Sequence, residues 1–262
     1  MTDIYTNIGS KTIDFFQTLM AALRVIPSAL RDFLFRFSLG RRATVRSLYK
    51  QIYFTGIEAL AIVSWIALTI GLIIVTQVIG ILPIIGGERM IGEILVWVVI
   101  RELGPLFAAI IVIARSGTAI SSELGSMKVN NEISALEMMG ISINQYVVMP
   151  RVIGTAIAVF GLTFYFEVVA ILGGYLLAGF GKSIAFSVYL ASILNASGVA
   201  DVAASTLKSI IFGLIIGAVC CYYGLRVGKS ITQIPQETTK AVIRILFLIF
   251  IADGVVTAAL FF

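Results

Sequence analysis

Two adjacent charged residues, Arg101 and Glu102, lie inside one of the most apolar stretches of the sequence, which runs from Ile94 to Ala114. A charge in the hydrocarbon core of a membrane costs at least ~2.5–3.5 kcal/mol on insertion scales, so such residues usually face a helix bundle or a wet cavity. Neighbouring residues on a helix point about 100° apart, so the two side chains cannot serve the same partner. This pair marks the first place to look for a transport site.

The composition is that of a protein that crosses a membrane several times. Of 262 residues, 59% are hydrophobic and 13% are charged, whereas soluble domains carry roughly 25% charged residues. Histidine is absent, which excludes histidine metal sites, serine triads and imidazole proton shuttles. The adjacent Cys220 and Cys221 are interpreted as core residues. We therefore expect no catalytic residue and no metal site in this chain.

Several stretches reach the roughly 20 apolar residues that a membrane-spanning helix needs. The predicted fold is an all-α membrane protein with five transmembrane helices, over residues 57–79, 92–114, 152–177, 206–226 and 241–261. The connector 178–204 has room for one short helix. The whole chain, 1–262, is expected to form a single domain, with a surface region at 10–50 and the bundle at 57–262.

Residues 10–38 place apolar side chains at helical spacing, with Pro27 expected to kink or end the helix. The pattern predicts an amphipathic helix on the cytoplasmic face of the membrane. A cap that packs on the bundle is an equally good interpretation.

Lysine and arginine concentrate in the N-terminal region and in residues 115–151 and 226–244, which accounts for the net charge of +5. By the positive-inside rule, the N-terminus, segment 115–149 and loop 227–240 are cytoplasmic, and the C-terminus faces outward. The basic residues are explained by this rule, so we expect no nucleic acid as a partner.

A phosphate-binding loop is rejected. The run Leu176–Ser183 ends like such a loop, but leucine stands at the position of its first glycine, and the run follows a span on the predicted outer side. We therefore expect no cofactor in this chain, and any ATP and Mg²⁺ would be bound by a separate ATPase subunit.

Segment 115–149 predicts a helix that starts near Glu132, with Asn130 or Asn131 as its cap. Part of this helix is apolar and adaptable, formed by Ile133, Leu136, Met138, Met139 and Gly140. Methionine-rich helices favour docking into the groove of a partner. A helix folded back on its own bundle fits the same pattern.

Four runs together resemble the MlaE-type permease family, the membrane subunits of Mla and Mce lipid ABC transporters. They are Arg101–Pro105 (RELGP), Ala114–Ala119 (ARSGTA), Glu123–Met127 (ELGSM) and Glu132–Met139 (EISALEMM). The resemblance extends over nearly the whole chain. The family often has Asp-Pro after the last run, where this chain reads Ser142-Ile143-Asn144, so the end of that helix is less well defined.

The resemblance implies a permease subunit in a bacterial inner membrane, which moves phospholipid and thereby serves outer-membrane lipid asymmetry. It implies a homodimer, a cytoplasmic ABC ATPase dimer docked on the coupling helices and a periplasmic ring of MCE domains, and it leaves room for a small accessory cytoplasmic subunit. The expected ATPase-coupling residues are Glu132, Ala135, Leu136, Glu137, Met138, Met139 and Gly140. A lipid cavity is expected at the two-fold axis.

The same resemblance gives the intramembrane charges a role. Arg101 is expected to bind a lipid phosphate, or to pair with Glu102 or Asp253. The apolar part of the site is assigned to residues near the outer end of the first span: Gln77, Ile81, Leu82 and Ile85. A structural ion pair that fixes helix register remains the alternative for Arg101 and Glu102, and it is the favoured interpretation for Asp253 and Lys208.

Three other functions stay open. The nearest is an Mce-type uptake permease for sterols or other lipids. An ion-coupled carrier or channel that acts without an ATPase would use Glu102, Glu167 and Asp253, whereas a scaffold would only anchor the complex. The coupling motif argues against the carrier.

Overall fold

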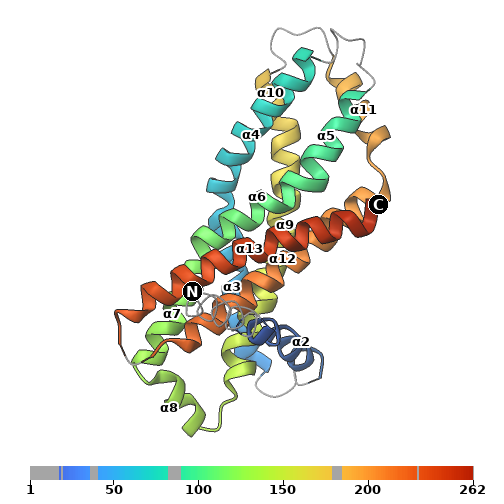
Figure 1. Cartoon of the computed structure of the whole chain (residues 1–262). Coiled ribbons are helices and arrows are strands. Elements are labelled where there is room, and N and C mark those ends of the chain that lie inside the picture. The colour runs from blue at the N-terminus through green and yellow to red at the C-terminus, as the bar shows by residue number, and fades with distance from the viewer. Residues whose placement is uncertain are drawn as a thin grey trace, which may run out of the picture.

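The computed structural model describes residues 18, 20–35, 41–81, 90–178, 185–228 and 230–261, which form helices joined by short turns (Figure 1). Within these ranges, five helical stretches are long and apolar enough to cross a membrane: Ala43–Gly80, Ile91–Val129, Asn144–Leu177, Val199–Arg226 and Gln233–Leu260. The predicted all-α fold with five spanning helices is confirmed.

The first span consists of α3 (Arg41–Thr55), a short 3₁₀ turn η1 (Ile57–Ala59) and α4 (Leu60–Ile81). The sequence assigned α3 to a surface region, but it leads directly into the span and packs against α9. Two of its polar residues, Gln51 and Thr55, are buried, and Gln51 Nε2 donates to Thr55 Oγ1 over 2.7 Å.

The second span continues well past its expected end at residue 114. It comprises α5 (Ile91–Leu95), the π-helical η4 (Val96–Leu103), α6 (Gly104–Val112), the π-helical η5 (Ile113–Gly117) and α7 (Thr118–Val129). Hydroxyl-bearing residues in the last part, Ser116 and Ser121, are buried because α7 packs against α12 and α13. Their polarity made this segment look separate from the membrane bundle.

The third span starts earlier than predicted, with the π-helical η6 (Asn144–Val148), and continues through α9 (Met149–Val168), the π-helical η7 (Val169–Gly173) and α10 (Gly174–Ala178). The short helix allowed in the connector is α11 (Phe186–Ala196). The last two spans are α12 (Val199–Arg226) and α13 (Gln233–Phe261).

Helix α12 is the centre of the bundle, because it packs against α9, α13, α7, α6 and η4. Its contact with α9 depends on Gly213 and Gly217, where an added Cβ would lie 2.4 Å from Ala156 Cα and 2.7 Å from Val152 Cα. This Gly-xxx-Gly spacing lets two membrane helices approach closely.

The two ends of the bundle are different (Figure 1). Helix α8 (Glu132–Met138) lies at one end, and α10 and α11 lie at the other. Helix α2 (Val25–Phe35) packs against α9, η6 and α12, with Ala22 and Ala29 buried. The part of the amphipathic segment that the structure describes therefore packs on the bundle, and a turn at Arg24 interrupts it just before Pro27. Residues 10–17 and 36–38 lie outside the described part of the chain.

Candidate functional site in the membrane core

Helix α12 carries a row of polar side chains through the apolar bundle. Asp201, Ser205 and Lys208 follow one another at spacings of four and three residues, which places them on one face of the helix. All three are buried, and each is bonded to a residue on another element. We call this set and its partners the charged network.

The Lys208 ammonium group is the centre of the network and is fully buried. It donates to the Arg101 carbonyl oxygen at 2.9 Å and to Glu102 Oε2 at 2.7 Å. Asp253 Oδ1 lies 2.8 Å from the same nitrogen. The ammonium group thus makes two hydrogen bonds and one further ion-pair contact. Lys208 thereby joins η4, α12 and α13.

Arg101 pairs with a residue that the sequence analysis did not single out. Its Nε donates to Asp201 Oδ1 over 2.5 Å, and Asp201 Oδ2 accepts the backbone N–H of Gly198 at 2.8 Å. Asp201 thus fixes the start of α12 and holds Arg101 at the same time. The predicted partners had been a phosphate, Glu102 or Asp253.

Arg101 and Glu102 serve different neighbours, as their helical geometry predicted. Glu102 contacts Lys208 on α12 and also accepts a hydrogen bond from Thr257 Oγ1 on α13 at 3.0 Å. Both residues lie in the π-helical stretch η4. Such stretches recur at functional sites.

Glu167 of α9 extends the network to a fourth element. Its Oε1 accepts a short hydrogen bond, 2.5 Å, from the buried Ser205 hydroxyl. A Cβ on Gly104 would lie 2.7 Å from Glu167 Cγ, so α6 and α9 are packed directly around this carboxyl group. The spacing of Asp201, Ser205 and Lys208 by four and three residues is the sequence signal from which Asp201 and Ser205 could have been predicted.

The structure brings together Arg101, Glu102 and Asp253, but not the whole predicted lipid site. Gln77 is exposed on α4, which is not among the helices that form the charged network. Ile81 ends α4, and its side chain is outside the description. Leu82 and Ile85 lie outside the described residues.

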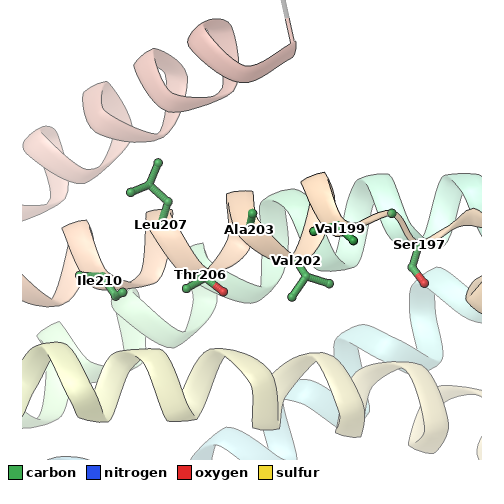
Figure 2. Close-up of a pocket in the computed structure, with 8 residues that line it drawn as sticks. Ser197, Val199, Val202, Ala203, Thr206, Leu207 and Ile210 are labelled. Atoms are coloured by element: carbon green, nitrogen blue, oxygen red, sulfur yellow. The ribbon is translucent and has the colours of Figure 1, made fainter.

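An open groove of about 760 Å³ runs along the outer face of α12 (Figure 2). Its lining is almost entirely apolar and includes Val199, Val202, Ala203, Thr206, Leu207 and Ile210. Figure 2 shows Leu207 on one side of the helix and Val202, Thr206 and Ile210 on the other. We call this the α12 groove.

Helix α8 starts at Glu132, as predicted, and follows Asn131, whose φ of 58° places it in the left-handed region. No side-chain hydrogen bond caps this helix. Ile133 is buried and Leu136 packs against the core, whereas Met138 and Met139 are 82% and 66% exposed. One side of α8 is therefore fixed to its own bundle, and the two methionines are exposed on the other.

The described residues hold no group of three or more cysteine and carboxylate side chains that could bind a metal ion. The site is one of ion pairs and apolar surface.

The comparison with known protein families decides what kind of molecule has this arrangement. The model of the family described as "Permease MlaE" matches residues 48–259. The chain belongs to the MlaE permease family. The match includes the charged network, the α12 groove and α8.

Relatives of this MlaE-family chain match most or all of its length. It is 30% identical to a probable ABC transporter permease protein of Rickettsia typhi over 100% of this chain and 99% of the relative. It is 31% identical to a probable ABC transporter permease protein of Synechocystis over 91% and 89%. The intermembrane phospholipid transport system permease protein MlaE of Haemophilus influenzae is 26% identical over 97% and 96%.

We predict that Lys208→Met destabilises this MlaE-family protein strongly, because it leaves Glu102 and Asp253 without their cation. Removing one partner of a buried ion pair typically costs ~3–5 kcal/mol. The triple variant Lys208→Met/Glu102→Gln/Asp253→Asn should recover most of the loss, since it leaves no lone charge. Thermal unfolding in detergent measures both.

The matched control is Lys240→Met, which breaks a more exposed ion pair with Glu237 and should change stability by less than about 1 kcal/mol. A Lys208→Met variant as stable as the wild type, or a triple variant less stable than the single one, would contradict the structural role of the network.

Proposed function

We propose that this chain is the permease subunit of an ABC transporter that moves phospholipid between a bacterial inner membrane and a periplasmic MCE-domain carrier. It works as a homodimer, and a separate ATPase dimer docked at its α8 end supplies the energy. The observation that carries the proposal is the pair of exposed methionines on a helix anchored at one end of a membrane bundle.

The geometry of α8 supports ATPase docking. Ile133 and Leu136 hold the helix against the bundle, so a force applied to α8 is transmitted to α7, against which it packs. Glu132 and the two methionines remain exposed for the partner. Flexible, polarizable methionine side chains adapt to a partner's groove. A small accessory cytoplasmic subunit would share this end of the bundle.

The α12 groove supports a lipid substrate. It is apolar and open along its length, which suits acyl chains. Arg101 is about a quarter exposed, but it does not line this groove, so it is a separate candidate for an anionic headgroup, which would have to compete with Asp201. Phospholipid is favoured over a sterol because a relative aligned with 97% of this chain is named as a phospholipid transport permease.

An ion-coupled carrier is disfavoured by the state of its candidate residues. Glu102 and Asp253 are both held by Lys208, and Glu167 accepts a hydrogen bond from Ser205. Carboxylates that are bonded to protein groups in this way serve helix packing more readily than ion passage.

The proposed orientation places the α8 end in the cytoplasm. Three parts of the structure belong to lysine- and arginine-rich segments. They are the start of the described chain, α8 and the turn between α12 and α13. Contacts of Gly125 with Val227 and Ile234 bring two of these segments together. Positive charge gathered at one end of a bundle favours the cytoplasmic side.

We predict that a cysteine at position 130 is labelled from the cytoplasm and one at position 195 from the periplasm. Both positions are exposed. The background replaces the buried Cys220 and Cys221 with alanine, and a membrane-impermeant maleimide is applied to intact and to permeabilised cells. Labelling of position 130 in intact cells would reverse the proposed orientation.

We predict that Met138→Asp and Met139→Asp leave the permease folded but weaken its binding to the ATPase subunit. Loss of an apolar anchor typically costs about 2 kcal/mol or more, which is roughly thirtyfold in affinity. Leu136 is a poorer test, because it packs against its own bundle. Co-purification and titration of the ATPase measure the effect.

The matched control is Met90→Asp, the same change at an exposed methionine that precedes α5, away from α8. It should bind the ATPase like the wild type. Unchanged binding in both α8 variants, or equal loss in the control, would refute docking through α8.

A further inference from the structure

A polar pocket of about 560 Å³ lies at the α8 end of the bundle, away from the charged network. It is formed between the chain just before α2, the end of α12 and the start of α13. Three cations line it, Arg226, Lys240 and Arg244, together with one carboxylate, Glu237. We call this the basic pocket.

The charges in the basic pocket leave an excess of positive potential. Lys240 and Glu237 form a 2.6 Å ion pair, and among the described lining residues the guanidinium groups of Arg226 and Arg244 add two further positive charges. Arg244 donates to the Tyr223 hydroxyl and its guanidinium lies 5.2 Å from the centroid of the same ring. The pocket wall on α13 is thereby fixed, which suits a bound anion.

Arg226 joins the basic pocket to a second cavity. Arg226 and Tyr222 also line a neighbouring groove of about 390 Å³, whose other lining residues include Val25, Val148 and Leu225. This lateral groove lies between α2, η6 and α12. Because Tyr222 and Arg226 line both cavities, the lateral groove, which is mostly apolar but includes Asn144, adjoins the cationic lining of the basic pocket.

A phosphate group beside an acyl chain is the chemistry that fits both cavities. Arginine binds phosphate through several N–H donors, and within the described residues Arg226 uses one of them in a long 3.5 Å hydrogen bond to Thr18. Basic pockets between membrane helices on the cytoplasmic side bind anionic headgroups. A free phosphate would use only the basic pocket and leave the lateral groove without a role.

We infer that the basic pocket and the lateral groove together bind one anionic phospholipid, with its phosphate at Arg226 and an acyl chain against Val25. This resident lipid is distinct from the transported one, and it ties the start of α2 to α12 and α13. Its assignment to the cytoplasmic leaflet rests on the proposed orientation; the binding itself does not.

The test uses the full-length chain in detergent and native mass spectrometry, with phosphatidylglycerol, phosphatidylcholine or inorganic phosphate as the probe. We expect one phosphatidylglycerol per chain that binds at least tenfold more tightly than phosphatidylcholine and withstands millimolar phosphate. Arg226→Glu removes the phosphate contact, and Val25→Trp fills the lateral groove without changing charge. Each variant should weaken binding at least tenfold.

Lys50→Glu is the matched control, because it reverses an exposed cation that lines neither cavity, and it should bind like the wild type. If Arg226→Glu does not fold, Arg226→Gln and Val25→Trp decide the question. Wild-type binding in the folded variants would overturn the inference. Displacement of the lipid by phosphate with no effect of Val25→Trp would also overturn it and indicate a site for free phosphate. Neither result bears on ATPase docking through α8, so the two proposals fail separately.

Discussion

The bundle depends on one ammonium group that has no contact with solvent. Lys208 lies in the first half of α12 and is held by Glu102, Asp253 and a backbone carbonyl. Burying an ion costs several kcal/mol even after relaxation, and only partners with good geometry offset that cost. The partners of Lys208 lie on η4 and α13. The free-energy cost of burying Lys208 is therefore offset only when these spans and α12 are aligned so that Lys208 meets Glu102 and Asp253. Arg101–Asp201 and Glu167–Ser205 extend the same constraint along α12.

Much of the fold could be predicted from the sequence, because the length of an apolar stretch indicates whether its helix can cross a membrane. The five spans, the short helix in the connector and the start of α8 at Glu132 were predicted in this way. The helix ends were not, because Ser116 and Ser121 look like surface residues until α7 is seen packed on α12. The polar sequence of α3 likewise predicted a surface helix, although α3 packs against α9.

The charged residues were recognised, but their pairing was not. Arg101 and Asp201 are 100 positions apart, and which carboxylate meets which cation depends on how η4 lies against α12. The spacing of Asp201, Ser205 and Lys208 contained the missing information, since one helix face with three polar residues needs partners across the bundle. Leu82 and Ile85, expected in the lipid site, are outside the described structure and remain predictions.

The surfaces to which functions are proposed lie at different levels of the bundle. The α8 end displays methionines and holds the basic pocket, whereas the middle of the bundle carries the charged network and the α12 groove. Such a layout suits a permease in which an event at α8 is passed through α7 to α12. In such a permease the charged network would hold α12 rigidly against its neighbours, and the apolar groove on the opposite face of α12 would be the proposed lipid surface.

In the proposed function, this chain moves phospholipid only when an ATPase drives it. The most direct measurement is transfer of a fluorescent phospholipid by proteoliposomes that contain the permease with its ATPase subunit, compared with liposomes that contain the permease alone. We predict transfer that requires ATP and both subunits, and we predict that a sodium or proton gradient cannot replace ATP as its energy source. Gradient-driven transport by the permease alone would contradict it.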